Sequence, residues 1–232
     1  MRNKALKSCR ICHSKNLLKY LDLGKHPFSN SFINKKQIKF EKKFPLELVF
    51  CKKCYLSQLS IIPDTKFIFD KYDYLSSTSK ALSNHYKNLV ETILKKEKLK
   101  RNDAVIDIGC NDGVLLNHYP NYIKNIIGIE PSNTINYIDK KKIIPLKQFF
   151  NFKTSVQYLK KFDKPKIITI TNVLAQIADL NDFVKGLETI LRDDGIIIIE
   201  FPYLIDMIDK GYFDLIYHEH LSYFALNPLK FL

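Results

Sequence analysis

The sequence has few arginines for so basic a chain, and this scarcity narrows the range of functions. Only four of its 37 basic residues are arginine, and the remaining lysines are scattered along a chain of net charge +13. Arginine is the residue favoured for bidentate contacts to phosphates and bases, so this composition argues against a nucleic-acid partner. The lysines predict a solvated basic surface, which also suits anionic small molecules.

Segments that would take the chain into or across a membrane are missing too. The longest apolar runs, such as 195-GIIIIEF-201, fall far short of the roughly 20 residues that span a bilayer. The N-terminus, 1-MRNKALKSCR-10, lacks the apolar segment of a signal peptide. We therefore expect a cytoplasmic protein with no membrane partner, in which 232 residues form one large and one small domain.

Cysteine is also scarce, but its placement is informative. Four of the five cysteines form two Cys-x-x-Cys hooks, 9-CRIC-12 and 51-CKKC-54. Disulfides would need an oxidising compartment, and a thioredoxin-type redox pair would need neither the second hook nor this context. Four thiolates at this spacing suit a structural Zn²⁺ ion, and Arg10 and nearby lysines would offset the net negative charge of the zinc–thiolate centre. The expected metal ligands are Cys9, Cys12, Cys51 and Cys54.

Changes of pattern along the chain predict a small domain, a connecting segment and a core. Residues 1–70 hold the hooks and a stretch rich in Gly, Pro, Ser and Asn, which favours loops and short strands. Residues 71–100 form a linker that ends in a helix, because apolar side chains recur at helical spacing from 79 onwards. Residues 101–232 alternate between apolar strands and helices, typical of a doubly wound α/β sheet with its ligand at the carboxyl ends of the strands.

The turn after the first core strand lacks the glycine pattern of a dinucleotide site. Where G-x-G-x-x-G would let the backbone touch a pyrophosphate, the chain reads 109-GCNDG-113. After the second strand, Glu130 is placed to accept hydrogen bonds from both ribose hydroxyls. A ligand with nucleoside and amino-acid parts but no phosphate fits this turn better than a dinucleotide does, which points to S-adenosylmethionine. The alternative is an α/β domain without a ligand here, with a tight turn and a surface glutamate. The expected binding residues are Asp107, Gly109, Asn111, Asp112, Gly113 and Glu130.

Several segments occur in the same order as in one known family, and they cover nearly the whole chain. They are 9-CRIC-12, 21-LDLGKHPFSNSF-32, 51-CKKC-54, 72-YDYLSSTS-79, 106-IDIGCNDGVLL-116, 128-GIEPS-132, 172-NVLAQIADLNDF-183 and 217-YHEHLSYF-224. Together they resemble the zinc-containing sugar C-methyltransferases of branched-deoxysugar biosynthesis. The resemblance implies a class I methyltransferase (Rossmann-like) core after a zinc domain, with S-adenosylmethionine as cofactor. It also implies a nucleotide-linked 4-keto sugar as substrate, methylated at C3.

The resemblance further implies which residues do the chemistry. Methylation at carbon needs a carbanion or enolate, so a base must remove the proton beside the ketone while the oxygen charge is stabilised. His220 would be that base, since histidine titrates near neutrality. Tyr217 and Glu219 would position the substrate and polarise the enolate, and Tyr72 or Tyr74 would close over the site.

Other interpretations of 217-YHEH-220 remain open, namely a polar surface segment or a metal site. In an extended chain His218 and His220 share one face and Tyr217 and Glu219 share the other, so both pairs serve one site only where the chain bends. His218 is therefore the weaker candidate.

Two positions depart from the family pattern. Asn172 would contact cofactor or substrate, but Gln176 replaces a family histidine, and glutamine cannot titrate. Family members also continue for a domain-sized stretch after the His-Glu-His segment, and two more strands normally follow the one at 195–201. We therefore expect that strand to be an exposed apolar edge in a truncated enzyme, with a separately encoded C-terminal fragment as a candidate partner. The alternatives are an inactive fragment that keeps zinc and cofactor, or an O- or RNA methyltransferase.

Overall fold

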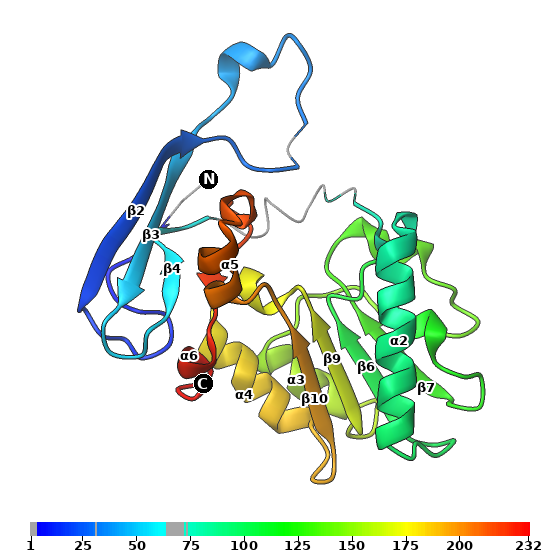
Figure 1. The fold of residues 1–232 in the computed structure, drawn as a ribbon. Coiled ribbons are helices and arrows are strands. Elements are labelled where there is room, and N and C mark those ends of the chain that lie inside the picture. The colour runs from blue at the N-terminus through cyan, green and yellow to red at the C-terminus, as the bar shows by residue number, and fades with distance from the viewer. Residues whose placement is uncertain (1–3, 31, 64–71, 73) are drawn as a thin grey trace. The chain divides into compact units, whose positions relative to one another are not determined.

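The computed structural model describes residues 4–30, 32–63, 72 and 74–232, which form two compact units (Figure 1). The N-terminal unit combines the described residues up to 63 with 172–181 and 200–232, and the sheet unit comprises 72–171 and 182–199. This division differs from the boundaries expected from the sequence. The last part of the chain groups with the cysteine hooks, not with the sheet.

A five-stranded sheet forms the centre of the sheet unit, in the order β10-β9-β6-β7-β8. The central strand β6 pairs in parallel with both β7 and β9, and β7 pairs in parallel with β8. Isoleucine and valine dominate these strands because the central ones are buried on both faces. The doubly wound α/β fold predicted from the sequence is therefore confirmed. The strands are β6 (Ala104–Ile108), β7 (Asn125–Ile129), β8 (Ile144–Leu146), β9 (Ile167–Thr171) and β10 (Ile196–Glu200).

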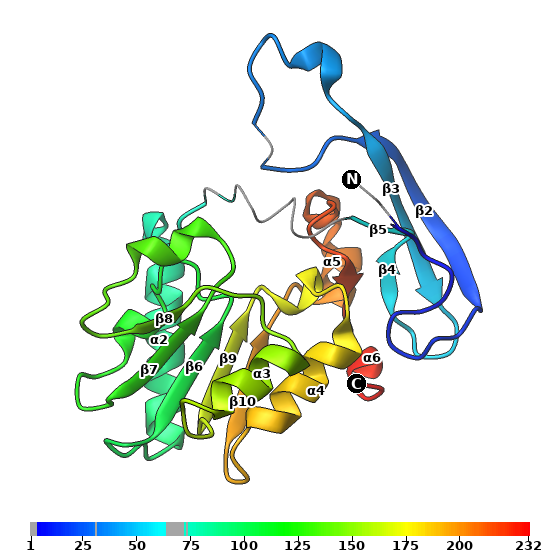
Figure 2. The ribbon, with the colours of Figure 1, turned by 180° about the vertical axis from the view of Figure 1, so that it is seen from behind.

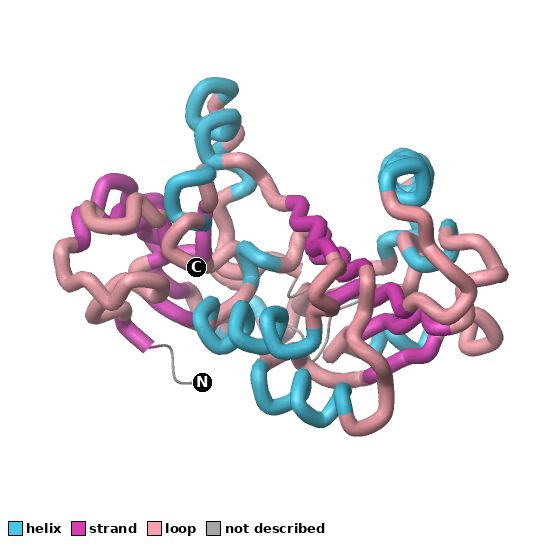
Figure 3. The backbone as a smooth tube through the Cα atoms, turned by 90° about the horizontal axis from the view of Figure 1, so that it is seen from below, coloured by secondary structure: helices cyan, strands magenta, loops and turns pink. Residues whose placement is uncertain are grey.

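Helices cover both faces of this sheet. The helix α2 (Lys80–Lys96) lies on one face (Figure 1), and α3 (Phe152–Leu159) and α4 (Leu180–Ile190) lie on the other (Figure 2). Figure 3 shows helices on both sides of the strands. The helix α2 begins after Ser79, whose side chain accepts a hydrogen bond from the backbone N–H of Leu82 and so caps the first turn.

The strand β10 ends the order of the sheet, as the sequence predicts for 195–201. Its residues are mostly half-buried, and Ile199 is 37% exposed. Among the described strands it is therefore an apolar edge.

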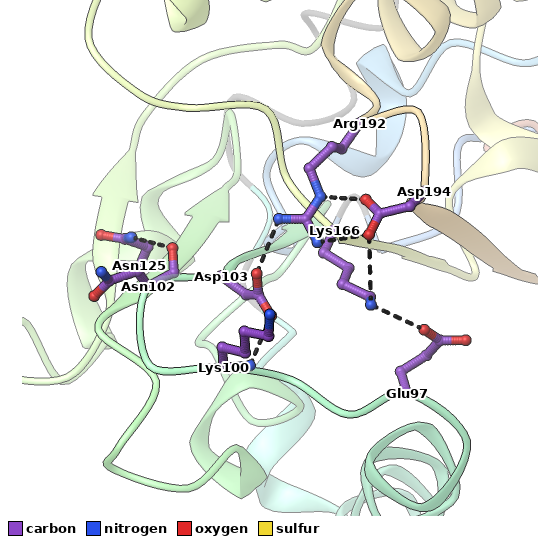
Figure 4. Close-up of polar contacts among 8 residues, drawn as sticks. All are labelled: Glu97, Lys100, Asn102, Asp103, Asn125, Lys166, Arg192 and Asp194. Atoms are coloured by element: carbon purple, nitrogen blue, oxygen red, sulfur yellow. Dashed lines mark hydrogen bonds and ion pairs between the residues drawn. The ribbon is translucent and has the colours of Figure 1, made fainter.

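Charged residues tie together the loops at the amino ends of these strands (Figure 4). The guanidinium of Arg192 lies 2.9 Å from the carboxylate of Asp103 and also contacts Asp194. Lys166 lies 3.5 Å from Glu97 at the end of α2 and 3.7 Å from Asp194. This network lies at the edge of the sheet opposite the carboxyl ends of the strands and has a structural role.

The N-terminal unit has its own four-stranded sheet, in the order β11-β4-β3-β2. A long antiparallel pair, β2 with β3, spans the region between the hooks, where we expected loops and short strands. That expectation was wrong for β2 and β3, where apolar residues outweigh the turn-forming ones, but the described residues between them, 27–30 and 32–43, contain no strand. The strands are β2 (Leu17–His26), β3 (Phe44–Cys51), β4 (Ser57–Leu59) and β11 (Ser222–Tyr223), beside a separate pair of β1 (Lys4–Ala5) and β5 (Ile61–Ile62).

The C-terminal elements belong to this unit because they bury its apolar surface. The helices α5 (Leu204–Lys210) and α6 (Leu226–Leu229) flank β11 in the chain. Side chains of α5 and β11 share one hydrophobic cluster with β3 and β4, made of Leu46, Leu48, Leu59, Leu204, Met207, Leu221 and Tyr223. Short 3-10 helices complete the fold: η1 (Ile38–Phe40), η2 (Ser76–Thr78), η3 (Leu116–His118), η4 (Asn133–Tyr137), η5 (Leu174–Gln176) and η6 (Phe213–Leu215). Within the described part of the chain, no helix combines the length and apolar character needed to cross a membrane.

Candidate functional site

The four cysteines of the hooks converge in the N-terminal unit. Their sulfur atoms all lie within 4.8 Å of one another, with 3.4 Å between Cys9 and Cys54 and 3.5 Å between Cys12 and Cys51. A tetrahedral Zn²⁺ ion about 2.3 Å from each sulfur needs sulfur separations of about 3.8 Å, so the cluster fits this ion. All four ligands come from the protein, which leaves no position for a substrate. The zinc site is therefore structural.

In the sheet unit, residues 109–113 form a tight turn after β6, called the cofactor turn below. Gly109, Asn111 and Gly113 adopt positive φ angles of 74°, 52° and 78°. A Cβ atom on Gly113 would lie 3.0 Å from the side chains of Ile138 and Ile143. The turn thus needs glycine both for its backbone conformation and for its packing.

Two side chains of the cofactor turn hold the segment before α2 in place. The Asn111 carboxamide accepts from the N–H of Ser76 at 3.0 Å and donates to the carbonyl of Tyr74 at 2.9 Å. One carboxylate oxygen of Asp112 accepts from the N–H of Ser77 at 3.0 Å. We expected Asn111 to bind cofactor, but its side chain is occupied by the protein's own backbone. Its first effect is to position residues 74–77.

Two acidic side chains near the cofactor turn have different surroundings. The Glu130 carboxylate accepts from the N–H of Asn111 at 3.2 Å and from the N–H of Ser132 at 2.8 Å. Asp107 is buried within β6 and accepts from the Thr169 hydroxyl at 2.6 Å. Burial, with the nearby Glu130 charge, raises the pKa of Asp107 to about 7. Asp107 therefore carries its charge less readily than an ordinary aspartate.

The donor and acceptor set at this turn fits S-adenosylmethionine. The second oxygen of Asp112 is buried and has no hydrogen-bond partner among the described residues, although a buried carboxylate oxygen normally has one. A ligand ammonium group would supply that partner. Both oxygens of Glu130 keep a further lone pair, which suits a ribose diol.

In the N-terminal unit, residues 217–220 form a bent segment, called the Tyr217–His220 turn below. The N–H of His220 donates to the carbonyl of Tyr217 at 3.0 Å, and the Tyr217 hydroxyl lies 2.9 Å from Nε2 of His220. The other ring nitrogen, Nδ1, lies 3.0 Å from the carbonyl of Leu215 and must donate to it. This contact leaves the lone pair of the neutral ring on Nε2. Burial lowers the pKa of His220 and raises that of Tyr217 to about 12.

The other two side chains of the Tyr217–His220 turn, His218 and Glu219, contact different neighbours. His218 is buried, with Nε2 3.1 Å from the carbonyl of Pro45 and its ring edge-on to Phe28. Glu219 is buried and accepts from the side-chain amide of Asn30 at 2.8 Å. Burial raises the pKa of Glu219, so its carboxyl group holds a proton at a higher pH than usual. His218 therefore packs against Pro45 and Phe28. From the sequence it was already the weaker candidate for a catalytic role.

The remaining predicted residues are Asn172, Tyr72 and Tyr74, together with Gln176, and the Tyr74 carbonyl is the one that accepts from Asn111. Asn172 is exposed in the N-terminal unit, with a positive φ of 58°, and its amide lies 3.5 Å from the carboxylate of Glu200. Gln176 ends η5 and is half-buried. Tyr72 is half-buried and Tyr74 is 46% exposed, both in the sheet unit.

Sequence reasoning missed several contacts that shape these sites. Asn30 was not singled out, although its left-handed φ of 56° signals a tight turn. Thr169 looked like an ordinary strand residue. The contacts of the Arg10 side chain with the distant residues Ile177 and Leu221 were also missed, because long-range contacts leave no local pattern in the sequence.

Comparison with known proteins agrees with these features. Residues 79–230 match the family model described as "Methyltransferase domain", and residues 9–69 match the one described as "Putative zinc binding domain". The chain is 24% identical over 228 residues to the C-methyltransferase NovU of Streptomyces niveus, covering 97% of this chain and 54% of that protein. It is 29% identical over 158 residues to the uncharacterized protein MJ1252 of Methanocaldococcus jannaschii, covering 63% of this chain and 58% of that protein.

The chain spans about half the length of the curated relatives it matches. Among solved structures, the YcgJ protein of Bacillus subtilis is similar over 63% of this chain and 65% of that chain, with 15% identity and a TM-score of 0.49. The methyltransferase model matches more than half of the chain, over the parallel sheet and the cofactor turn described above. The chain therefore belongs to the class I S-adenosylmethionine-dependent methyltransferase family, and it carries an N-terminal zinc-binding domain.

Proposed function

We propose that the protein is a C-methyltransferase that acts on a nucleotide-linked keto sugar. The relative NovU, which is named a C-methyltransferase, supports transfer to carbon. The basic surface suits a substrate that carries phosphates. The observation that carries the proposal is the setting of His220: Nδ1 donates to the Leu215 carbonyl, so the neutral ring keeps its lone pair on Nε2, beside the Tyr217 hydroxyl.

In the proposed reaction His220 acts as the general base. Its Nε2 takes the proton from the carbon beside the ketone, and the electrons of the C–H bond form an enolate. The cofactor turn and Glu130 would hold S-adenosylmethionine, which would supply an electrophilic methyl group to that carbon and leave as S-adenosylhomocysteine. Burial favours neutral His220 before the reaction, which keeps the base ready near neutral pH.

Two neighbours of His220 would stabilise the developing negative charge on oxygen. The Tyr217 hydroxyl can rotate, so it can donate to the enolate oxygen once Nε2 holds the proton. Burial raises the pKa of Glu219, which favours the protonated form of this carboxyl group, and that form would donate to the same oxygen. Asn30 holds the Glu219 carboxyl group in place through its hydrogen bond.

A second candidate function is zinc and cofactor binding without turnover. Gln176 favours it, because this residue replaces a family histidine and cannot titrate. Transfer to oxygen is a further alternative, since a base beside a hydroxyl would use the same residues. The scarcity of arginine argues against RNA as the substrate.

The direct test supplies the protein with methyl-labelled S-adenosylmethionine and a panel of nucleotide-linked 4-keto sugars. The proposal expects a sugar with a new carbon–methyl bond, identified by its proton and carbon NMR couplings. A methyl ether product would show O-methylation, and calorimetric cofactor binding without any methylated sugar would favour the second candidate.

A further inference from the structure

The side chain of Arg10 connects the first cysteine hook to two distant segments of the N-terminal unit. One terminal nitrogen donates to the carbonyl of Ile177 at 2.6 Å and to that of Ala178 at 3.3 Å. The other donates to the carbonyl of Leu221 at 2.6 Å and also contacts the Ser222 hydroxyl. A planar guanidinium with fixed donor directions is the side chain suited to such bridging.

The backbone of Arg10 is fixed as firmly as its side chain. Its N–H donates to the side-chain oxygen of Gln58 in β4 at 3.2 Å. The side-chain amide of Asn181 donates to the carbonyls of Arg10 and Ile11, both at 3.1 Å. Cys9 and Cys12 flank this pair as metal ligands. The position of the guanidinium therefore follows from the geometry of the hook.

Each of the two segments that Arg10 contacts begins directly after a residue considered above, His220 or Gln176. Leu221 directly follows His220, and its carbonyl also accepts from the N–H of Leu59 at 3.0 Å. Ile177 directly follows Gln176. A shift of the guanidinium would therefore move the backbone next to the proposed base and next to the replaced family histidine.

The charge of the zinc site favours this placement of the cation. Four thiolates around one Zn²⁺ ion leave a net negative charge, and the positive guanidinium belongs to the residue after the ligand Cys9. The Nε atom of Arg10 is shielded from solvent and has no partner among the described residues, so the side chain is held mainly by its terminal nitrogens.

We propose that Arg10 is a positioning residue through which the zinc site sets the place of His220. Zinc fixes the hook, the hook fixes the guanidinium, and the guanidinium holds the 177–178 and 221–222 segments. The catalytic consequence rests on the proposed function, but the structural coupling does not.

The experiment compares Arg10→Met and Arg10→Lys with Arg101→Met, which removes an exposed arginine of the sheet unit. Zinc content and calorimetric affinity for S-adenosylmethionine verify that each variant is folded. The informative readout is the nitrogen NMR spectrum of the His220 ring, which reports whether the proton is held on Nδ1. Modification by diethyl pyrocarbonate gives an independent measure of how exposed that ring is.

We expect Arg10→Met to keep zinc and cofactor affinity while the His220 ring loses its single tautomer and reacts roughly tenfold faster with the reagent, since removed hydrogen bonds allow local opening. With an active substrate, kcat should fall by about 100-fold with little change in the cofactor KM, as for a misplaced catalytic group. Arg10→Lys keeps the charge but cannot bridge both segments. It should therefore show the same changes in the His220 ring, in tautomer and reactivity, but to a smaller extent.

An unchanged His220 spectrum in Arg10→Met would overturn the inference. Loss of zinc in both Arg10 variants would also overturn it, since Arg10 would then support the hook and not the distant segments. Failure of the wild-type protein to methylate any sugar would count against the proposed function alone, because the ring spectrum is read without turnover.

Discussion

The hydroxyl of Tyr217 lies 2.9 Å from Nε2 of His220, within a turn closed by the backbone hydrogen bond between the same two residues. The hydrogen bond from Nδ1 to the Leu215 carbonyl leaves the Nε2 lone pair as the acceptor in this contact. A base and a proton donor thus lie side by side on one short segment. In the proposed reaction this pair supplies the base and a donor for the developing negative charge.

Removing the Tyr217 hydroxyl should slow the reaction without weakening cofactor binding. We expect Tyr217→Phe to lower kcat by roughly 10- to 100-fold, because a lost hydrogen bond to a charged group is worth about 1.5–3 kcal/mol. Steady-state kinetics would show the loss in kcat, with the KM for S-adenosylmethionine unchanged. Tyr212→Phe is the matched control, since Tyr212 is 45% exposed in the same unit. Equal kinetics in both variants would remove Tyr217 from the mechanism.

Activity should persist to lower pH than an ordinary histidine base allows. Burial lowers the pKa of His220 below its model-peptide value of 6.5, opposed in part by the Leu215 carbonyl. The acid limb of the kcat/KM profile, which reports the free enzyme, should therefore lie below pH 6.5. An acid limb above that value would mean that another group, or an altered His220 environment, controls the rate.

The same direction of shift has a consequence for stability. His218 and His220 both have pKa values lowered mainly by burial, so the unfolded chain takes up protons more readily than the folded one. Their contribution to stability is present above pH 6.5 and is lost as pH falls through the lowered values. The raised pKa of Asp107 changes stability in the opposite direction over the same range, so the histidine contribution is read from the difference between wild type and His218→Phe in urea unfolding between pH 7 and pH 5. His218→Phe should lose less stability than the wild type as pH falls, and an equal pH dependence in the two proteins would contradict this.

Asp112 should contribute directly to cofactor affinity. Asp112→Asn keeps the shape of the side chain and an acceptor for the Ser77 N–H, but it removes the negative charge. We expect the Kd for S-adenosylmethionine to rise about 10- to 100-fold, the range of a charged hydrogen bond of about 1.5–3 kcal/mol. Calorimetry beside Asp139→Asn, an exposed aspartate of the same unit, would separate this effect from general charge loss. Equal affinity for S-adenosylmethionine in the two variants would mean that residues other than Asp112 bind its ammonium group.

Loss of one metal ligand should unfold the N-terminal unit while sparing the sheet unit. Cys51→Ser should release the zinc and lower the thermal stability, because structural zinc contributes to folding directly. Cys110→Ser is the control, since Cys110 is buried in the sheet unit away from the sulfur cluster. Metal analysis and a thermal melt check both variants. Full zinc content in Cys51→Ser would contradict the four-cysteine site.

The sheet, its flanking helices and the metal cluster could be predicted because their signals are local. Apolar strands such as 104–108 and the helical spacing from 80 to 96 depend on neighbouring residues only. The paired hooks have a spacing that metal chemistry itself requires. These features therefore follow from the sequence alone.

The division into units could not be predicted in the same way. Helix α5 and strand β11 pack into the N-terminal unit through side chains such as Met207 and Tyr223, which meet partners far away in the sequence. The roles of Asn111 and Arg10 were hidden for the same reason. Each side chain was assigned to the nearest expected ligand, whereas the structure directs both to distant backbone groups.

The proposed removal of a proton from carbon by His220 can be observed without methyl transfer. The protein is incubated in deuterium oxide with a nucleotide-linked 4-keto sugar and S-adenosylhomocysteine, and the proton beside the ketone is followed by NMR. We expect enzyme-dependent loss of that proton signal, slowed about 100-fold or more in His220→Gln, as on removal of a general base. Equal exchange rates in the wild type and His220→Gln would contradict it.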